Sequence, residues 1–183
     1  MEIVLIFAHQ LYAFRYAGQT ADELERLFDI WTDAGYLEQF FENNLSDLQN
    51  GYYGNITVAQ AVKRTIYHAR CLETDLRRLA KNDPESANNT LEDLFTPLDN
   101  REFGTIVLSK QKAYGVNYNS WLRLYAFKID PGVYIITGGA IKLTPTMNER
   151  AHTQKELEKL EKCRTYLAAQ GLIDNEGFKE EFN

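Results

Sequence analysis

The sequence predicts an α+β fold in which helices pack on one face of a small antiparallel sheet. Three observations support this prediction: capped amphipathic helices fill the first half, alternating strands joined by a tight turn come late, and a capped helix follows them. This order differs from the regular strand–helix alternation of βαβ proteins. A chain of 183 residues with 44% hydrophobic content is large enough to bury the core of one α+β domain, residues 1–183.

The first strands are expected at the N-terminus. Residues 3–7 form an apolar run, and residues 10–16 alternate between aromatic and other side chains. These two segments fit either a hairpin around Ala8 and His9 or one bent strand.

Side-chain caps followed by apolar stripes predict the helices. Thr20 with Glu23 forms a capping box ahead of a stripe at helical spacing: Leu24, Leu27, Phe28 and Trp31. Asp33 is expected to cap a second, short helix, and Thr57 with Gln60 to open the longest one, residues 58–81. That helix lies in a predicted helical insertion at about 45–119, where it would cover part of the sheet as a lid. Residues 105–108 read as a strand edge and residues 110–119 as a loop.

Residues 121–143 read as an antiparallel meander. Alternation over 121–129 places Leu122, Leu124 and Ala126 on one face, and the other face carries Trp121, Arg123, Tyr125 and Phe127. Asp130-Pro131-Gly132 is a turn, since proline presets φ and glycine accepts a positive φ. Residues 133–137 return as the partner strand, and residues 140–143 continue after a kink at two glycines.

The last helix is expected to open at a capping box of Thr153 and Glu156 and to end at Gly171. Its charged residues, such as the Glu158 and Lys162 pair, are expected on a solvated face.

Charge and composition restrict the classes of function. The net charge is −6 and the sequence pI about 5.2, so no overall positive field attracts nucleic acid, and any such binding requires a local basic cluster. Two cysteines without a CxxC spacing favour a reducing compartment. No signal peptide and no run near the ~20 apolar residues of a membrane span is evident. The expected location is the cytoplasm, with no membrane contact.

A short motif in the meander carries a family resemblance. The pattern R-x-Y-x-F at Arg123, Tyr125 and Phe127 is followed by the turn and then by T-G-G-A-I-K-L-T, which contains Lys142 and Thr144. Residues 121–167 thereby resemble the RelE/ParE toxin superfamily, and most closely its HigB-like, phage-derived branch. Residues 45–119 have no counterpart in the pattern.

The resemblance implies a ribosome-dependent mRNA endoribonuclease that a small helix-turn-helix antitoxin neutralises. Arg123 falls on the strand arginine of the pattern and Lys142 on the lysine that closes the next strand. Arg150 and His152 follow the sheet, where some members place additional basic or imidazole groups.

RNA cleavage by a 2′-hydroxyl needs a base, cations that stabilise the phosphorane-like charge, and an acid for the leaving oxygen. Arg123, Lys142 and Arg150 are candidates for charge stabilisation, and His152 for acid or base. Tyr125 is a candidate for stacking on a base or positioning a phosphate. No cofactor or metal is expected, because the three histidines are dispersed in the sequence. Each candidate also has a structural alternative, such as a solvent-facing strand residue or a helix cap.

A second hypothesis is a noncatalytic protein-binding module on the same scaffold. Its partner would be the antitoxin or another copy of the chain, and its basis is a set of tyrosines in loops: Tyr52, Tyr53, Tyr114 and Tyr118. The two hypotheses predict different surfaces. An enzyme requires Arg123, Lys142 and Arg150 or His152 in one positive concave site, with the first two on the same side of the sheet. A binding module requires a tyrosine-rich apolar patch away from them.

Overall fold

The computed structural model describes residues 1–7, 10–49, 52–83, 88–98, 108–114, 119–172 and 177–178. Within these residues the strands form one sheet in the order β1-β2-β6-β5-β4-β3. Their bounds are β1 (Glu2–Phe7), β2 (Leu11–Arg15), β3 (Phe95–Pro97), β4 (Ser109–Ala113), β5 (Leu122–Asp130) and β6 (Val133–Ile141). The predicted α+β class is confirmed.

The sheet is mixed, which corrects the expectation of a purely antiparallel one. β1 and β2 pair as the hairpin, one of the two arrangements expected, but β2 pairs with β6 in parallel, and the remaining neighbours are antiparallel. The two parallel strands are far apart in the sequence, with α1 to α4 and β3 to β5 between them, and parallel neighbours do require a long connection.

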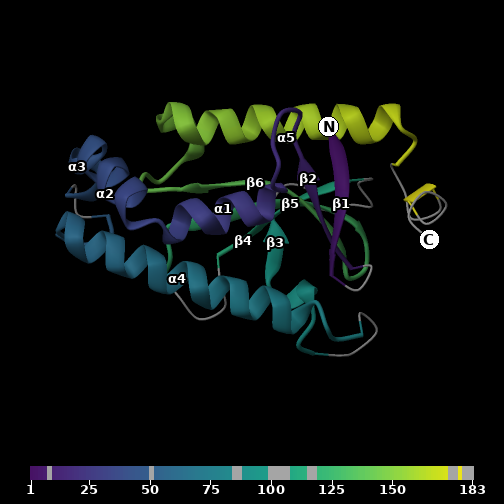
Figure 1. Cartoon of the computed structure of the whole chain (residues 1–183), viewed down its shortest axis with the longest axis horizontal. Helices are drawn as coiled ribbons and strands as arrows, with labels where there is room; N and C mark the ends of the chain where they lie inside the picture. Colours follow the sequence, from purple (N-terminus) through teal and green to yellow (C-terminus); the bar gives the residue numbers. More distant parts are fainter. Residues whose placement is uncertain are drawn as a thin grey trace.

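Helices cover both faces of the sheet, which corrects the prediction that they pack on one face (Figure 1). The helices are α1 (Glu23–Thr32), α2 (Ala34–Asn43), α3 (Leu45–Leu48), α4 (Val58–Leu79) and α5 (Ala151–Ala169), with short 3₁₀ turns η1 (Leu91–Asp93) and η2 (Met147–Glu149). Side chains of α1, α2 and α4 share one core with the sheet, and α5 packs on the opposite face. The physical reason is that β2 and β5 are apolar on both faces, so each face needs a cover.

The long helix α4 belongs to the larger of these cores. Its apolar line includes Ala61, Leu72 and Leu76, all buried, and it packs against α1, α2 and β5. The range 45–119 also contains β3 and β4, so the loop predicted over 110–119 is wrong for β4. Most of the strand edge expected at 105–108 lies outside the described residues, as does the stretch 115–118.

The helix caps agree with the sequence in part. Thr57 and Gln60 form the predicted capping box, Asp33 caps α2, and Gly171 follows α5 with φ of +72°. The first cap is Asp22, whose carboxylate accepts from the backbone N–H of Leu24 and Glu25, in place of Thr20.

The last helix opens earlier than predicted, at Ala151, because η2 runs almost directly into it. Thr153 Oγ1 donates to the carbonyl oxygens of Met147 and Arg150 instead of capping a helix. In the parts of the chain that the structure describes, no helix combines the length and apolar character needed to span a bilayer.

In β6, a β-bulge takes the place of the predicted glycine kink between residues 137 and 140. Residues 133–141 are one continuous strand, and Thr137 is the extra residue in the ladder, because Tyr125 pairs with Gly138 and Ala126 with Ile136. The two glycines after the bulge permit close packing. A Cβ on Gly139 would lie 2.7 Å from the carbonyl oxygen of Arg123 and 2.8 Å from the Trp31 ring.

Candidate cationic site

A cavity of about 190 Å³ lies between the ends of β4, β5 and β6 and the η2 turn. Three of its lining side chains are cationic: Lys112, Arg123 and Lys142. The other described lining residues are uncharged at neutral pH: Leu98, Tyr114, Tyr125, Pro145, Thr146 and Met147. This acidic protein therefore has a locally positive cavity.

Strand register brings the three cations together. Lys112 of β4 pairs with Tyr125 of β5, and Arg123 pairs with Ala140 of β6. Residues two apart on a strand share a face, so Arg123 lies on the same face as Tyr125, and Lys142 continues the face of Ala140. Tyr125 and Ala140 both belong to the core beneath α5, which identifies the face.

Arg123 is the most deeply placed of the three, with 9% of its surface exposed. Its Nη1 donates to the carbonyl oxygens of Ser120, at 2.6 Å, and Leu122, at 2.7 Å. Its Cζ lies 4.0 Å from the centroid of the Tyr114 ring, a cation–π contact. The guanidinium is thus held rigidly at the cavity wall with its charge uncompensated by a carboxylate among the lining residues.

Lys142 and Lys112 are each anchored by one backbone carbonyl. The Nζ of Lys142 donates to the Pro145 oxygen at 2.5 Å, and that of Lys112 to the Leu98 oxygen at 3.0 Å. Burial lowers the pKa of Lys142, the nearby Arg123 and Lys112 charges lower it further, and Glu149 opposes them. The positive charges of the cavity repel one another, and a bound anion would offset this repulsion.

Tyr125 supplies a hydroxyl that cannot readily act as a base. Its oxygen lies 3.3 Å from the Met147 sulfur, to which it donates, and burial raises the pKa of Tyr125 well above the ordinary value. The phenol therefore remains protonated at neutral pH.

The structure places Arg150 and His152 away from the cavity. Arg150 Nε donates to Asp47 Oδ2 at 2.5 Å, in an ion pair that ties the end of η2 to α3. His152 Nε2 lies 2.9 Å from the Ile141 carbonyl oxygen, and its ring meets Phe40 edge to face at 5.3 Å. Both contacts hold the segment that follows β6. Of the residues that the enzyme hypothesis places in one site, the cavity therefore contains Arg123 and Lys142 but neither Arg150 nor His152.

Two of the predicted loop tyrosines lie at the cavity. Tyr114 stacks on Arg123, and the hydroxyl of Tyr53 donates to the carbonyl oxygen of Lys142 at 3.1 Å. The position of Tyr118 is outside the described residues. Tyr53 and Tyr114 therefore do not form a patch separate from the cations, as the binding-module hypothesis required.

Sequence reasoning missed Lys112. Its strand reads Ser-Lys-Gln-Lys-Ala, which has no apolar face to produce a period of two, and the strand is recognisable only from its pairing with β3 and β5. The only local sign of a basic strand face is Lys110, two residues before Lys112, and a solvated loop explains this spacing equally well.

The described residues contain no group of three or more His, Cys, Asp or Glu side chains placed to hold a metal ion. Cys163 is buried and Cys71 half-buried, and both are free thiols. His9 lies outside the described residues. The chain has no significant match among protein-family models, curated proteins or solved structures.

Proposed function

We propose that this chain binds an RNA phosphate in the cavity formed by Lys112, Arg123 and Lys142, and acts as a RelE/ParE-like toxin-type protein of the cytoplasm. The observation that supports the proposal is the gathering of three cations from three strands around one cavity. Arginine and lysine in a partly desolvated site are the usual protein ligands of phosphate.

The proposed reaction is RNA cleavage by transesterification, in which the cavity cations act without Arg150 and His152, the two expected participants that lie outside the cavity. The 2′-oxygen forms a bond to phosphorus, the bond from phosphorus to the 5′-oxygen breaks, and the products are a 2′,3′-cyclic phosphate and a 5′-hydroxyl. Arg123 and Lys112 stabilise the charge of the phosphorane-like transition state. Lys142, whose pKa is lowered, donates a proton to the leaving 5′-oxygen. The proton of the 2′-hydroxyl passes to water.

The toxin part of the proposal depends on the motif in residues 121–167. It implies a small helix-turn-helix protein as partner, encoded beside this chain, and translated mRNA as substrate. The positive charge of the cavity supports RNA as the substrate class. The partner is tested separately, by asking whether the neighbouring gene encodes a helix-turn-helix protein.

The test is expression of the wild type, Lys112→Ala, Lys142→Ala and, as a matched control, Lys162→Ala on the exposed side of α5. We expect the wild type and Lys162→Ala to inhibit growth and cleave translated mRNA, and the two cavity variants to do neither while keeping a wild-type melting temperature. A wild type that leaves growth and mRNA intact refutes the catalytic proposal. Its RNA affinity, measured with purified protein, then decides whether the binding part survives.

The alternative, a noncatalytic protein-binding module, is favoured by a second cavity of about 480 Å³ beside β1. β1 is an edge strand, and such an edge presents unpaired backbone groups. The apolar lining includes Leu24 and Phe28. The charged residues of the same groove are four acidic ones and one arginine, which pairs with Glu73: Asp22, Glu25, Asp29, Glu73 and Arg77. A basic, extended peptide would complement this groove.

In that case Leu5→Asp, in the exposed middle of β1, abolishes binding of the neighbouring gene's product, and Lys142→Ala leaves it unchanged. If the wild type inhibits growth and cleaves mRNA while the cavity variants do neither, the purely noncatalytic alternative is contradicted.

A further inference from the structure

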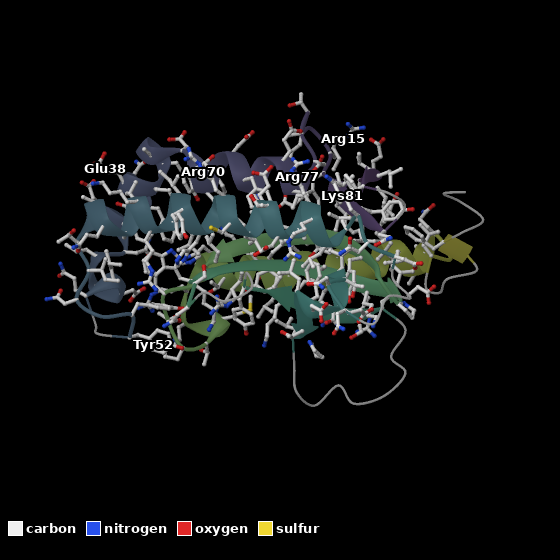
Figure 2. All side chains as sticks on the ribbon, turned by 90° about the horizontal axis from the view of Figure 1, so that it is seen from below. Arg15, Glu38, Tyr52, Arg70, Arg77 and Lys81 are labelled. Atoms are coloured by element: carbon white, nitrogen blue, oxygen red, sulfur yellow. The ribbon has the colours of Figure 1, made fainter. Side chains whose placement is uncertain are left out.

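Tyr52 presents an aromatic ring to solvent next to Tyr53, whose hydroxyl contacts the backbone of the cavity residue Lys142. Its exposure is 54%, among the largest of the described hydrophobic side chains. Figure 2 shows it at the margin of the molecule, away from Arg77 and Lys81.

The ring of Tyr52 is supported from behind. It packs edge to face on Tyr53, with centroids 4.7 Å apart and an interplanar angle of 85°. Tyr53 is half-buried and packs in turn on Trp121, at 5.3 Å and 88°. Trp121 is completely buried and its indole N–H donates to Thr65 of α4, so this chain of rings begins in the core and ends at the surface.

Tyr53 also connects the exposed ring to the cations. Its hydroxyl donates to the backbone oxygen of Lys142, and burial raises its pKa while the Arg123 charge opposes that rise. Tyr53 therefore contacts Tyr52 through its ring, and Arg123 and the backbone of Lys142 through its hydroxyl. Arg64 adds a further cation on this side, with its Cζ 4.5 Å from the Trp121 ring centroid and 6.0 Å from that of Tyr53.

A supported, exposed aromatic ring near a cationic cavity is the combination by which proteins hold single-stranded nucleic acid. The cations bind the phosphates of the nucleic-acid backbone. A base stacks on the aromatic ring, and this stacking offsets the cost of removing water from the base and the ring. A duplex does not offer an unstacked base for such contact.

We propose that Tyr52 is a stacking platform for a nucleobase of single-stranded RNA whose neighbouring phosphate occupies the cavity of Lys112, Arg123 and Lys142. The inference rests on the proposed function, because it takes the cavity as the phosphate site, and it adds the strandedness of the substrate and a base contact.

The test measures, by fluorescence anisotropy at fixed salt, the affinity for a short single-stranded RNA, for the same strand with abasic sugars throughout, and for its duplex. The proteins are the wild type, Tyr52→Ala, Tyr52→Trp and Lys142→Ala. Tyr67→Ala is the control, because Tyr67 is an equally exposed tyrosine, at 58%, on α4.

We expect Tyr52→Ala to weaken single-strand binding about tenfold and to leave abasic-strand binding unchanged. Tyr52→Trp keeps the affinity because it keeps a stacking ring, Tyr67→Ala has no effect, and the wild type binds the duplex more weakly than the single strand. Equal affinity of wild type and Tyr52→Ala for the single strand overturns the inference, and so does an equal loss on the abasic strand.

The two proposals fail differently in this experiment. If the abasic strand binds the wild type but not Lys142→Ala, the phosphate site stands whatever Tyr52 does. If no oligonucleotide binds the wild type, both proposals are wrong.

Discussion

Arg123 and Lys142 lie on the same face of the sheet because β6 carries one extra residue, Thr137, between its pairs with Tyr125 and Ala126 of β5. Before the bulge at Thr137, the odd-numbered Ile135 faces α5, and after it the even-numbered Ala140 does. Uninterrupted alternation would turn Lys142 to the other face, since a shift of one residue reverses every later side chain. The bulge therefore creates the cationic cavity.

The close packing behind the bulge predicts that Gly139→Ala is destabilising. The new methyl group meets the Arg123 carbonyl oxygen at 2.7 Å and the Trp31 ring at 2.8 Å, and neither can move freely in a filled core. We expect a loss of about 1–3 kcal/mol in the free energy of unfolding, measured by urea denaturation. Gly35→Ala in α2, where the nearest atom is at 3.4 Å, is the control and should be neutral or slightly stabilising. A stable Gly139→Ala protein would contradict the packing of β6 on α1.

The lowered pKa of Lys142 predicts a pH dependence of anion binding. A phosphodiester keeps its charge across the neutral and alkaline range. A loss of affinity on raising the pH therefore reports deprotonation of the lysine amine. The affinity for the abasic strand should fall at a pH below 10.5, the ordinary lysine value, because Lys142 is neutral above its pKa and no longer attracts the anion. Lys142→Arg should remove this fall. A titration in which wild type and Lys142→Arg superimpose would argue against Lys142 as a ligand.

Glu156 predicts a pH dependence of stability. Its side chain is only 11% exposed and its Oε2 has no hydrogen-bond partner among the residues that the structure describes. Burial therefore raises the pKa of this carboxyl in the folded protein, although Lys159 at 2.9 Å opposes the rise. The folded state then holds the proton more tightly than the unfolded state. Stability from this group is complete below the unfolded pKa, near 4.5, and is lost as pH rises through the folded pKa.

Glu156→Gln should therefore gain stability relative to the wild type as pH rises from 4 toward neutrality, in urea denaturation at several pH values. Glu158→Gln, an exposed neighbour on α5, serves as the comparison. A constant difference between wild type and Glu156→Gln across this range would show that the carboxyl does not titrate as described.

The ion pair of Arg150 with Asp47 predicts a structural role for a residue that the motif marks as a candidate for catalysis. Asp47 is 5% exposed, and removal of its partner leaves a buried carboxylate without a cation. Arg150→Ala should lower the melting temperature and leave RNA affinity unchanged. Adding Asp47→Asn should recover part of the loss. Weakened RNA binding by a folded Arg150→Ala protein would place Arg150 in the site after all.

Local patterns were sufficient for most helices and for the meander. The stripe of α1, the capping box of α4 and the alternation that separates Leu124 from Tyr125 are properties of neighbouring residues, and all appear in the structure. Trp121 is an exception: it joins the core with Leu122, because it precedes the first paired residue of β5 and alternation does not yet apply.

The chain's own sequence thus determined the longer helices, the faces of β5 and the turn at Pro131, since each depends on backbone preferences and burial within a few residues. Only the tertiary structure decided which charges meet. The bulge at Thr137, the pairing that brings in Lys112, and the contacts that take Arg150 and His152 out of the cavity all depend on partners distant in sequence. Hydrophobic periodicity does not reveal them, because β6 is buried on both faces and has no alternation for a bulge to interrupt, and an ion pair leaves no apolar repeat.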